Sequence, residues 1–227
     1  NGLQSGSVYA LIALGYIMVY GIIMLLNFAH GDIIMVGAYL IWIVVSRLGM
    51  PPVVGILAAV AGCTLLGVVI ERVAYKPLRS SPRLSLLITA IGVSFFLQNT
   101  AQLVMGAGSK TMPPIISGPN LKMGDITMSF VAMVTIAVSL ISMALLTLLV
   151  QKTKMGKAMR AVSEDMGAAQ LMGISVNKTI AFTFAIGSAL AGIGAVLYSC
   201  AYPQASPTMG GMLGLKAFVA AVLGGIG

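Results

Sequence analysis

The stretch from Ile126 to Gln151 reads ITMSFVAMVTIAVSLISMALLTLLVQ, and it decides the fold because it carries no charge over its whole length. It exceeds the ~20 residues that a helix needs to cross a hydrocarbon core of ~30 Å. Further uncharged runs of this kind are Asn1 to Gly31, Leu48 to Ile70, Leu84 to Ser109 and Thr179 to Leu215. Since lipid cannot satisfy backbone polar groups, such runs form helices or closed barrels, and the lack of two-residue alternation excludes a barrel. We therefore predict an all-α, polytopic transmembrane helix bundle.

The composition leads to the same class of protein. Hydrophobic residues make up 59% of the chain and charged residues 8%, against roughly 25% charge in soluble domains. The mean hydropathy is +1.03. The net charge of +8 needs no nucleic acid to explain it, because cytoplasmic Lys and Arg that face anionic membrane lipid account for most of it.

The distribution of positive charge orients the spans. Two hydrophilic breaks, 71–83 and 151–178, hold most of the cations: Arg72, Lys76, Arg79, Arg83, Lys152, Lys154, Lys157, Arg160 and Lys178. The positive-inside rule puts these breaks in the cytoplasm. The first span then runs inward, residues 27–32 lie near the inner side, and a short second span ends at Ser46. Helices follow near 53–72, 84–105, 126–150, 179–199 and 212–227, with 106–125 as an external loop.

This threading gives at least seven membrane segments. The chain starts on Asn and stops inside the apolar stretch 217–227, so we expect it to be a C-terminally incomplete part of a longer protein and the count to be a lower bound. We treat residues 1–227 as one transmembrane domain. Residues 6–39 and 179–225 each read as a helix, a polar break and a Gly-rich helix in opposite directions, which predicts a possible inverted repeat.

The inner break between Gln151 and Lys178 contains charged residues and apolar residues at helical spacing. Apolar Met159, Val162, Met166 and Ala169 recur at helical spacing, while Arg160 and Glu164 stand four residues apart on another face. An amphipathic helix at the cytoplasmic end of a bundle predicts a surface that docks another protein.

Enzymatic and metal chemistry find little support in the sequence. The segment Gly106 to Thr111 departs from the phosphate-loop order because Ser109 interrupts it. His30 and Asp32 alone make neither a zinc site nor a convincing acid–base pair. We expect no catalytic residues, no metal and no cofactor bound by this chain.

Several motifs stand out along the chain, namely NFAHGD at 27–32, IERVAYKPLRS at 70–80, AIGVSFFLQN at 90–99, the loop from Met155 to Ile174, and GLKAFVAAVLGGIG at 214–227. Together they closely resemble the membrane permease subunit of branched-chain amino acid ABC transporters. The resemblance covers essentially the whole chain. Permeases for urea and short amides are close relatives of this family, so urea and short amides remain the alternative substrates.

The resemblance implies a bacterial inner-membrane subunit that takes part in ATP-driven uptake of branched-chain amino acids. Its implied partners are a second permease subunit, two ATP-binding cassette subunits that use ATP and Mg, and a periplasmic substrate-binding protein. The core Ala168-Ala169-x-x-x-Gly173 resembles a coupling helix, although Gly167 stands where the family usually has Glu. The implied ATPase-coupling residues are Met159, Arg160, Val162, Glu164, Asp165, Met166, Ala168, Ala169 and Gly173.

The translocation path needs mostly apolar walls with a few polar groups. The candidates are Asn27, His30, Gln98, Asn99 and Lys216. We expect Lys216 to reach the membrane interface or to serve the path, and Gln98 and Asn99 to form interhelical hydrogen bonds. An ATP-independent secondary transporter is the second reading, but Asp32 is the only acid that the sequence puts near a span interior.

Overall fold

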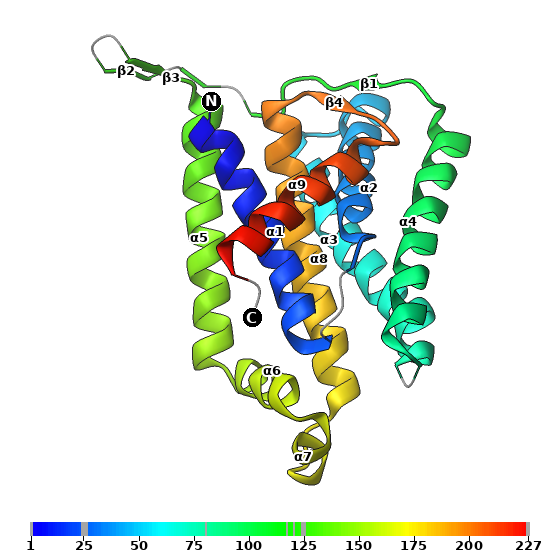
Figure 1. Cartoon of the computed structure of the whole chain (residues 1–227). Coiled ribbons are helices and arrows are strands. Elements are labelled where there is room, and N and C mark those ends of the chain that lie inside the picture. The colour runs from blue at the N-terminus through cyan, green and yellow to red at the C-terminus, as the bar shows by residue number, and fades with distance from the viewer. Residues whose placement is uncertain are drawn as a thin grey trace.

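Helices make up most of the computed structural model, which describes residues 2–23, 27–79, 81–116, 118–119, 121–123 and 126–225. The longer helices are α1 (Gly2–Ile23), α2 (His30–Trp42), α3 (Pro52–Ile70), α4 (Arg83–Met105), α5 (Phe130–Lys152), α8 (Val176–Ala201) and α9 (Met209–Gly224). Two short helices, α6 (Lys154–Glu164) and α7 (Met166–Leu171), join α5 to α8. Figure 1 shows α6 and α7 at one end of the bundle and the N-terminus at the other.

The remaining elements are short and lie at the helix ends. The π-helix η1 (Ile43–Arg47) continues α2, and the π-helix η2 (Glu71–Tyr75) and the 3-10 helix η3 (Lys76–Leu78) continue α3. Strand β1 (Lys110–Thr111) pairs antiparallel with β4 (Gln204–Ala205), and β2 (Leu121–Met123) pairs with β3 (Ile126–Met128). These strands connect the helices at the end of the bundle that holds the N-terminus (Figure 1).

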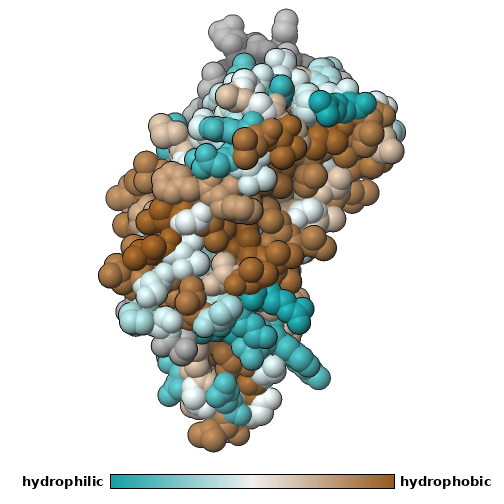
Figure 2. Space-filling view, turned by 90° about the vertical axis from the view of Figure 1, so that its right-hand side faces the viewer, coloured by the Kyte–Doolittle hydropathy of each residue, from teal (hydrophilic) through white to brown (hydrophobic). Residues whose placement is uncertain are grey.

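The predicted spans are confirmed. Among the described residues, six helices are long and apolar enough to cross a membrane, and α9 is a shorter seventh segment. The observed bounds stay close to the predicted ones. The largest differences are that α5 begins four residues late, at Phe130, and that α8 and α9 begin three residues early, at Val176 and Met209. Figure 2 shows a broad hydrophobic band across the middle of one face, with hydrophilic side chains gathered toward both ends.

The core is built from α1, α2, α3, α8 and α9, whereas α4 and α5 stand at the periphery. Small residues let the central helices approach closely. A Cβ atom at Gly192 of α8 would lie 2.8 Å from Cα of Val60 in α3, and Ala59, Ala191 and Ala195 are fully buried. In lipid the hydrophobic effect does not drive helices together. Close backbone contact of this kind stabilises their packing through van der Waals attraction instead.

The two basic breaks lie at the same end of the bundle. Arg79, after η3, donates a hydrogen bond of 2.5 Å from Nη1 to Oδ1 of Asn177 at the start of α8, and α6 and α7 lead directly into α8. This end is the cytoplasmic one by the charge rule. By the same rule, the opposite end, with Arg47 and Lys110, is expected to face outward.

Candidate coupling surface and translocation path

The starts of α2 and α9 meet in the bundle, although 179 positions separate their contact residues Gly31 and Gly210 in the numbering. A Cβ atom at Gly210 would lie 2.7 Å from the carbonyl oxygen of Gly31 and 2.7 Å from Oδ1 of Asp32. A Cβ atom at Gly31 would lie 3.0 Å from Cα of Gly214. Only glycine permits this approach, so two helices that follow chain breaks are held backbone to backbone.

A second reciprocal contact joins α1 to α8, the helices that precede these breaks. A Cβ at Gly15 would lie 3.1 Å from the carbonyl oxygen of Gly187, and a Cβ at Gly187 would lie 3.3 Å from that of Gly15. The pairs Gly15–Gly187 and Gly31–Gly210 thus match the two helix-break-helix units to each other. This is the geometry that an inverted repeat calls for, and the repeat itself stays a prediction.

His30 lies beside α1 at the start of α2. Its ring centroid is 4.7 Å from that of Tyr16, and a Cβ at Gly15 would come within 2.5 Å of its Nε2. His30 is 1% exposed, and no described residue forms a hydrogen bond with Nε2. Tyr16 precedes the end of α1 by seven residues, about 10 Å at 1.5 Å per residue, so His30 lies within the depth of the span.

Asp32 is fully buried and joins α2 to the peripheral helix α4. Ser94 donates from Oγ to Oδ2 of Asp32 at 2.5 Å, and Gln98 donates from Nε2 to Oδ1 at 3.0 Å. Asp32 also lies in the first turn of α2, where the helix dipole favours negative charge. The predicted interhelical hydrogen bond of Gln98 is confirmed, and Ser94 is a partner that the sequence analysis missed.

Asn27 lies closer to the inner end, where Tyr75 of η2 donates a hydrogen bond of 2.8 Å to its Oδ1. A few residues earlier in the same π-helix, Glu71 is 2% exposed and forms an ion pair with Arg79. Glu71 is therefore a second buried acid beside Asp32, and the expectation that Asp32 is the only acid near a span interior is wrong. The ion pair with Arg79 compensates the charge of Glu71.

The other two path candidates lie on exposed surfaces. Asn99 donates from Nδ2 to the carbonyl oxygen of Phe95 at 2.7 Å, within its own helix, so its predicted interhelical bond is wrong. Lys216 lies in the middle of α9 rather than near its start, and its Nζ is 5.9 Å from the ring centroid of Tyr9 in α1. Among the described residues, no three His, Cys, Asp or Glu side chains gather into a metal-binding group.

At the inner end, α6 packs one face onto the bundle. Met159 and Val162 are 3% and 1% exposed and join the core cluster that includes residues of α1 and α8, and Ala169 of α7 is also buried. Thr153 caps α6 by accepting from Gly156 N at 3.0 Å. Gly156 makes the turn from α5 possible, because a Cβ there would collide with the carbonyl oxygens of Leu149 and Val150.

The predicted amphipathic helix is two helices with a break at Asp165. Asp165 has φ −153° and ψ 111°, and its Oδ1 accepts from Gly167 N at 2.7 Å and Ala168 N at 3.0 Å. Asp165 is thus the N-cap of α7. No ion pair joins Arg160 to Glu164, both of which are described. The exposed coupling candidates are Arg160, Glu164, Asp165, Met166, Ala168 and Gly173.

The two ends of α7 carry large apolar side chains that are exposed. Leu171 is 91% exposed, Met172 is 82% exposed and Met166 is 41% exposed. Figure 1 places α7 at the bottom of the molecule. In Figure 2 the surface at the bottom is hydrophobic, and a hydrophilic zone lies above it. Leu171 and Met172 lie off the periodic apolar face, so the sequence analysis passed over them. We name Met166, Leu171 and Met172 the apolar tip.

The fold defines a class of protein: a multi-pass helical membrane protein with six long apolar helices and a shorter seventh among its described residues. The chain belongs to the family described as the permease component of the branched-chain amino acid transport system, which matches residues 1–227. It is therefore a membrane permease subunit and not a member of a catalytic family.

Individual relatives extend along the whole chain. It is 43% identical to the high-affinity branched-chain amino acid transport system permease protein BraD of Pseudomonas aeruginosa, covering 100% of this chain and 78% of that protein. It is 41% identical to the corresponding permease protein LivH of Salmonella typhimurium, with the same coverage. A nucleoside ABC transporter permease protein, NupB of Lactococcus lactis, is 27% identical over 45% of this chain. No solved structure matches. With these relatives, the spans make the chain a multi-pass protein of the bacterial inner membrane.

Proposed function

We propose that the chain forms half of the translocation path of an ATP-driven importer of branched-chain amino acids, and that an ATPase subunit docks on its apolar tip. The substrate class rests on the names of the relatives that match the whole chain. The docking site rests on one observation, namely three large apolar side chains exposed beyond the hydrophilic inner zone. Exposed apolar clusters rimmed by polar residues mark interaction sites.

The remaining parts of the importer follow from the same proposal. A second permease subunit completes the path, two ATP-binding cassette subunits bind ATP and Mg, and a periplasmic binding protein delivers the amino acid. This chain binds no cofactor itself. The exposed Arg160 and Glu164 on α6 orient the docked ATPase by charge, whereas Asp165 holds α7 in place as its N-cap.

The packing of α6 supplies a route for motion. The buried Met159 and Val162 belong to the cluster that joins α6 to α1 and α8, so a displacement of α7 moves these two helices. Because α1 and α8 lead into the breaks before α2 and α9, the motion reaches the contact of Gly31 with Gly210. Packed interfaces of this kind have discrete arrangements rather than continuous ones, which suits a path that opens alternately to each side.

The test is ATP-dependent leucine uptake by the full-length protein, reconstituted in liposomes with its partner subunits. The double variant Leu171→Glu/Met172→Glu places charge on the apolar tip, and Gln170→Glu on the same helix is the control. Losing two apolar contacts at a docking site costs ~2 kcal/mol each, so uptake and ATPase co-purification should fall more than tenfold. Unchanged uptake in the double variant refutes the docking site. Uptake without ATP refutes the importer, and ATP-driven uptake of urea but not leucine refutes the substrate.

A further inference from the structure

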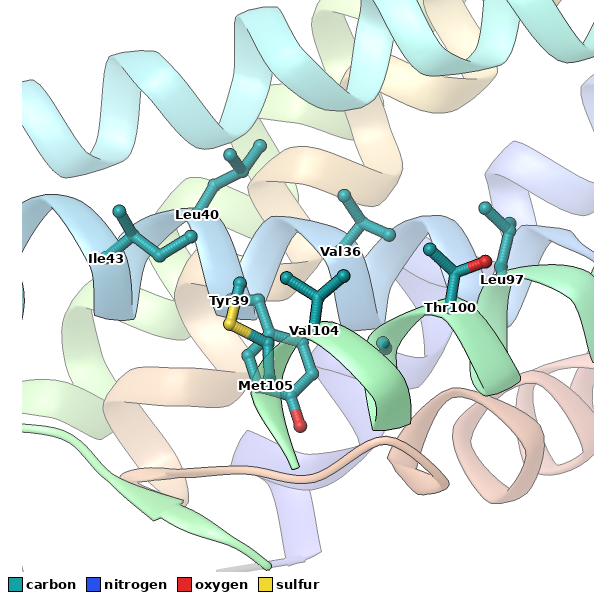
Figure 3. A pocket seen from close by; sticks show the side chains of 9 residues that line it. Val36, Tyr39, Leu40, Ile43, Leu97, Thr100, Val104 and Met105 are labelled. Carbon is teal, nitrogen blue, oxygen red and sulfur yellow. The ribbon is translucent and has the colours of Figure 1, made fainter. Parts of the chain in front are cut away.

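An apolar groove of about 180 Å³ lies between α2 and α4 (Figure 3). Its wall comes from both helices, chiefly Val36, Leu40, Ile43, Leu97, Val104 and Met105. Met105 is the last residue of α4 and Ile43 follows the end of α2, so the groove reaches the outer end of the bundle. Val104 is 69% exposed, which leaves the groove open to the membrane along one side.

The groove contains a buried hydroxyl that has no partner among the described residues. Tyr39 lines the wall and is 3% exposed, yet no described residue forms a hydrogen bond with its hydroxyl. Figure 3 shows its ring beside Met105. A buried hydroxyl without a partner costs free energy, so a ligand that offers an acceptor at this depth would be stabilised.

Two cations stand over one aromatic ring at the outer end of α2. The guanidinium carbon of Arg47 is 5.4 Å from the ring centroid of Trp42, and Nζ of Lys110 is 5.7 Å from it. Trp42 lies three residues after Tyr39, about 4.5 Å further along the helix axis. Neither cation forms an ion pair within the part of the chain that the structure describes, and Trp favours the interface between membrane and water.

We infer that this groove and the Trp42 cation pair bind an anionic phospholipid of the outer leaflet. An acyl chain fills the apolar groove, Tyr39 donates its hydroxyl hydrogen bond to an ester carbonyl, and the headgroup phosphate lies between Arg47 and Lys110. The charges argue against the transported amino acid as the occupant, because its carboxylate would meet the two cations but its ammonium group would find no described acid beside them. The described acids lie elsewhere: Asp32 begins α2, and Glu71, Glu164 and Asp165 belong to η2, α6 and the α6–α7 break.

The first test compares phospholipids by native mass spectrometry of the full-length protein. Phosphatidylglycerol should bind in preference to phosphatidylethanolamine, and Arg47→Gln/Lys110→Gln should weaken phosphatidylglycerol binding roughly tenfold, since each cation near an anionic headgroup contributes severalfold. The charge-matched control at the inner end, Lys152→Gln/Lys154→Gln, should change it less than about twofold at this site. Equal binding of the two lipids, or equal effects of the two double variants, overturns the inference.

The second test locates the acyl chain. Phosphatidylglycerol with a photoreactive acyl chain should label peptides of α2 and α4. Val104→Trp fills the groove and should abolish this labelling, whereas Leu65→Trp on α3, also at a position 69% exposed, should preserve it. Labelling that spreads evenly over α3 and α5 overturns the inference. Displacement of the label by leucine, or by the second permease subunit, assigns the groove to that occupant and also overturns it.

Discussion

The backbones of Gly31 and Gly210 touch where the helices α2 and α9 begin, and neither position has room for a Cβ atom. This contact brings together the two helices that follow the chain breaks, deep in the bundle. Asp32 lies immediately beside it, with its carboxylate shared between Ser94 and Gln98 of α4. One small region thus ties three membrane segments to one another.

Gly210→Ala is expected to destabilise this junction. The new Cβ would lie 2.7 Å from both the Gly31 carbonyl oxygen and Asp32 Oδ1, and overpacking of this kind costs ~1–3 kcal/mol. Thermal unfolding of the purified protein in detergent should show the loss. Gly211→Ala is the matched control, because its Cβ would make only an ordinary contact of 3.7 Å with Gln98. Equal unfolding temperatures for the two variants would contradict the tight contact.

The hydrogen bond between Asp32 and Gln98 is expected to couple α2 to α4. A double-mutant cycle with Asp32→Ala and Gln98→Leu, each of which removes the bond, should give a coupling of ~0.5–2 kcal/mol in the free energy of unfolding, the range for interhelical hydrogen bonds in membranes. The control is Asn99→Leu, which removes a bond within α4 and should leave the Asp32 variant's effect unchanged. A coupling energy of zero between Asp32 and Gln98 would show that this hydrogen bond does not stabilise the packing of α2 on α4.

Asp165 is expected to act through its capping oxygen rather than its charge. Asp165→Asn keeps an acceptor for Gly167 N and Ala168 N and should retain ATPase docking. Asp165→Ala removes the cap, at ~1 kcal/mol, and should weaken docking about fivefold. Binding of the partner ATPase to the reconstituted permease measures both variants. If Asn weakens docking as much as Ala does, the carboxylate charge and not the cap is what the partner requires.

The buried pair of Glu71 and Arg79 is expected to respond unequally to single and double substitution. Arg79→Met leaves the carboxylate of Glu71, 3% exposed at its side chain, without its cation, and breaking such a pair costs ~3–5 kcal/mol. Glu71→Leu/Arg79→Met removes both charges and should recover most of this loss. Chemical unfolding in mixed detergent compares the variants. A double variant less stable than Arg79→Met would refute the compensation.

Much of the fold could be predicted because span length and charge bias are local properties of the sequence. Uncharged runs such as 126–151 predicted the membrane-spanning helices, and the cations at 72–83 and 152–178 predicted which end of the bundle is the inner one. The predicted polar break at 27–32 is confirmed in part, because Asn27 precedes α2, whereas His30 and Asp32 already belong to its first turn. The pattern could not predict how deep in the bundle His30 lies. His30 packs beside Tyr16 only because position 15 of α1 is a glycine, which leaves room for the imidazole ring.

The docking surface shows where periodicity misleads. Met159, Val162, Met166 and Ala169 keep helical spacing across position 165, so the pattern predicted one helix where the chain forms two. Asp165 before Met-Gly-Ala-Ala carried the capping signal that reveals the break. The same periodic face turned out to pack inward at Met159 and Val162. Of the residues left for a partner, Met166 follows the pattern, whereas Leu171 and Met172 interrupt it.

The meeting of α2 with α9 also sets an order of events during synthesis. The polar residues Asn27, His30 and Asp32 enter the membrane with the first segments, but the helices α8 and α9 that pack on α2 are translated about 140 residues later or more. At ~5–20 residues per second, this delay lasts on the order of ten seconds. During that interval the hairpin of α1 and α2 lacks the cover of α8 and α9, while Asn27 and Asp32 already have partners in η2 and α4. Truncation before α8 is therefore expected to destabilise this hairpin through the loss of its covering helices.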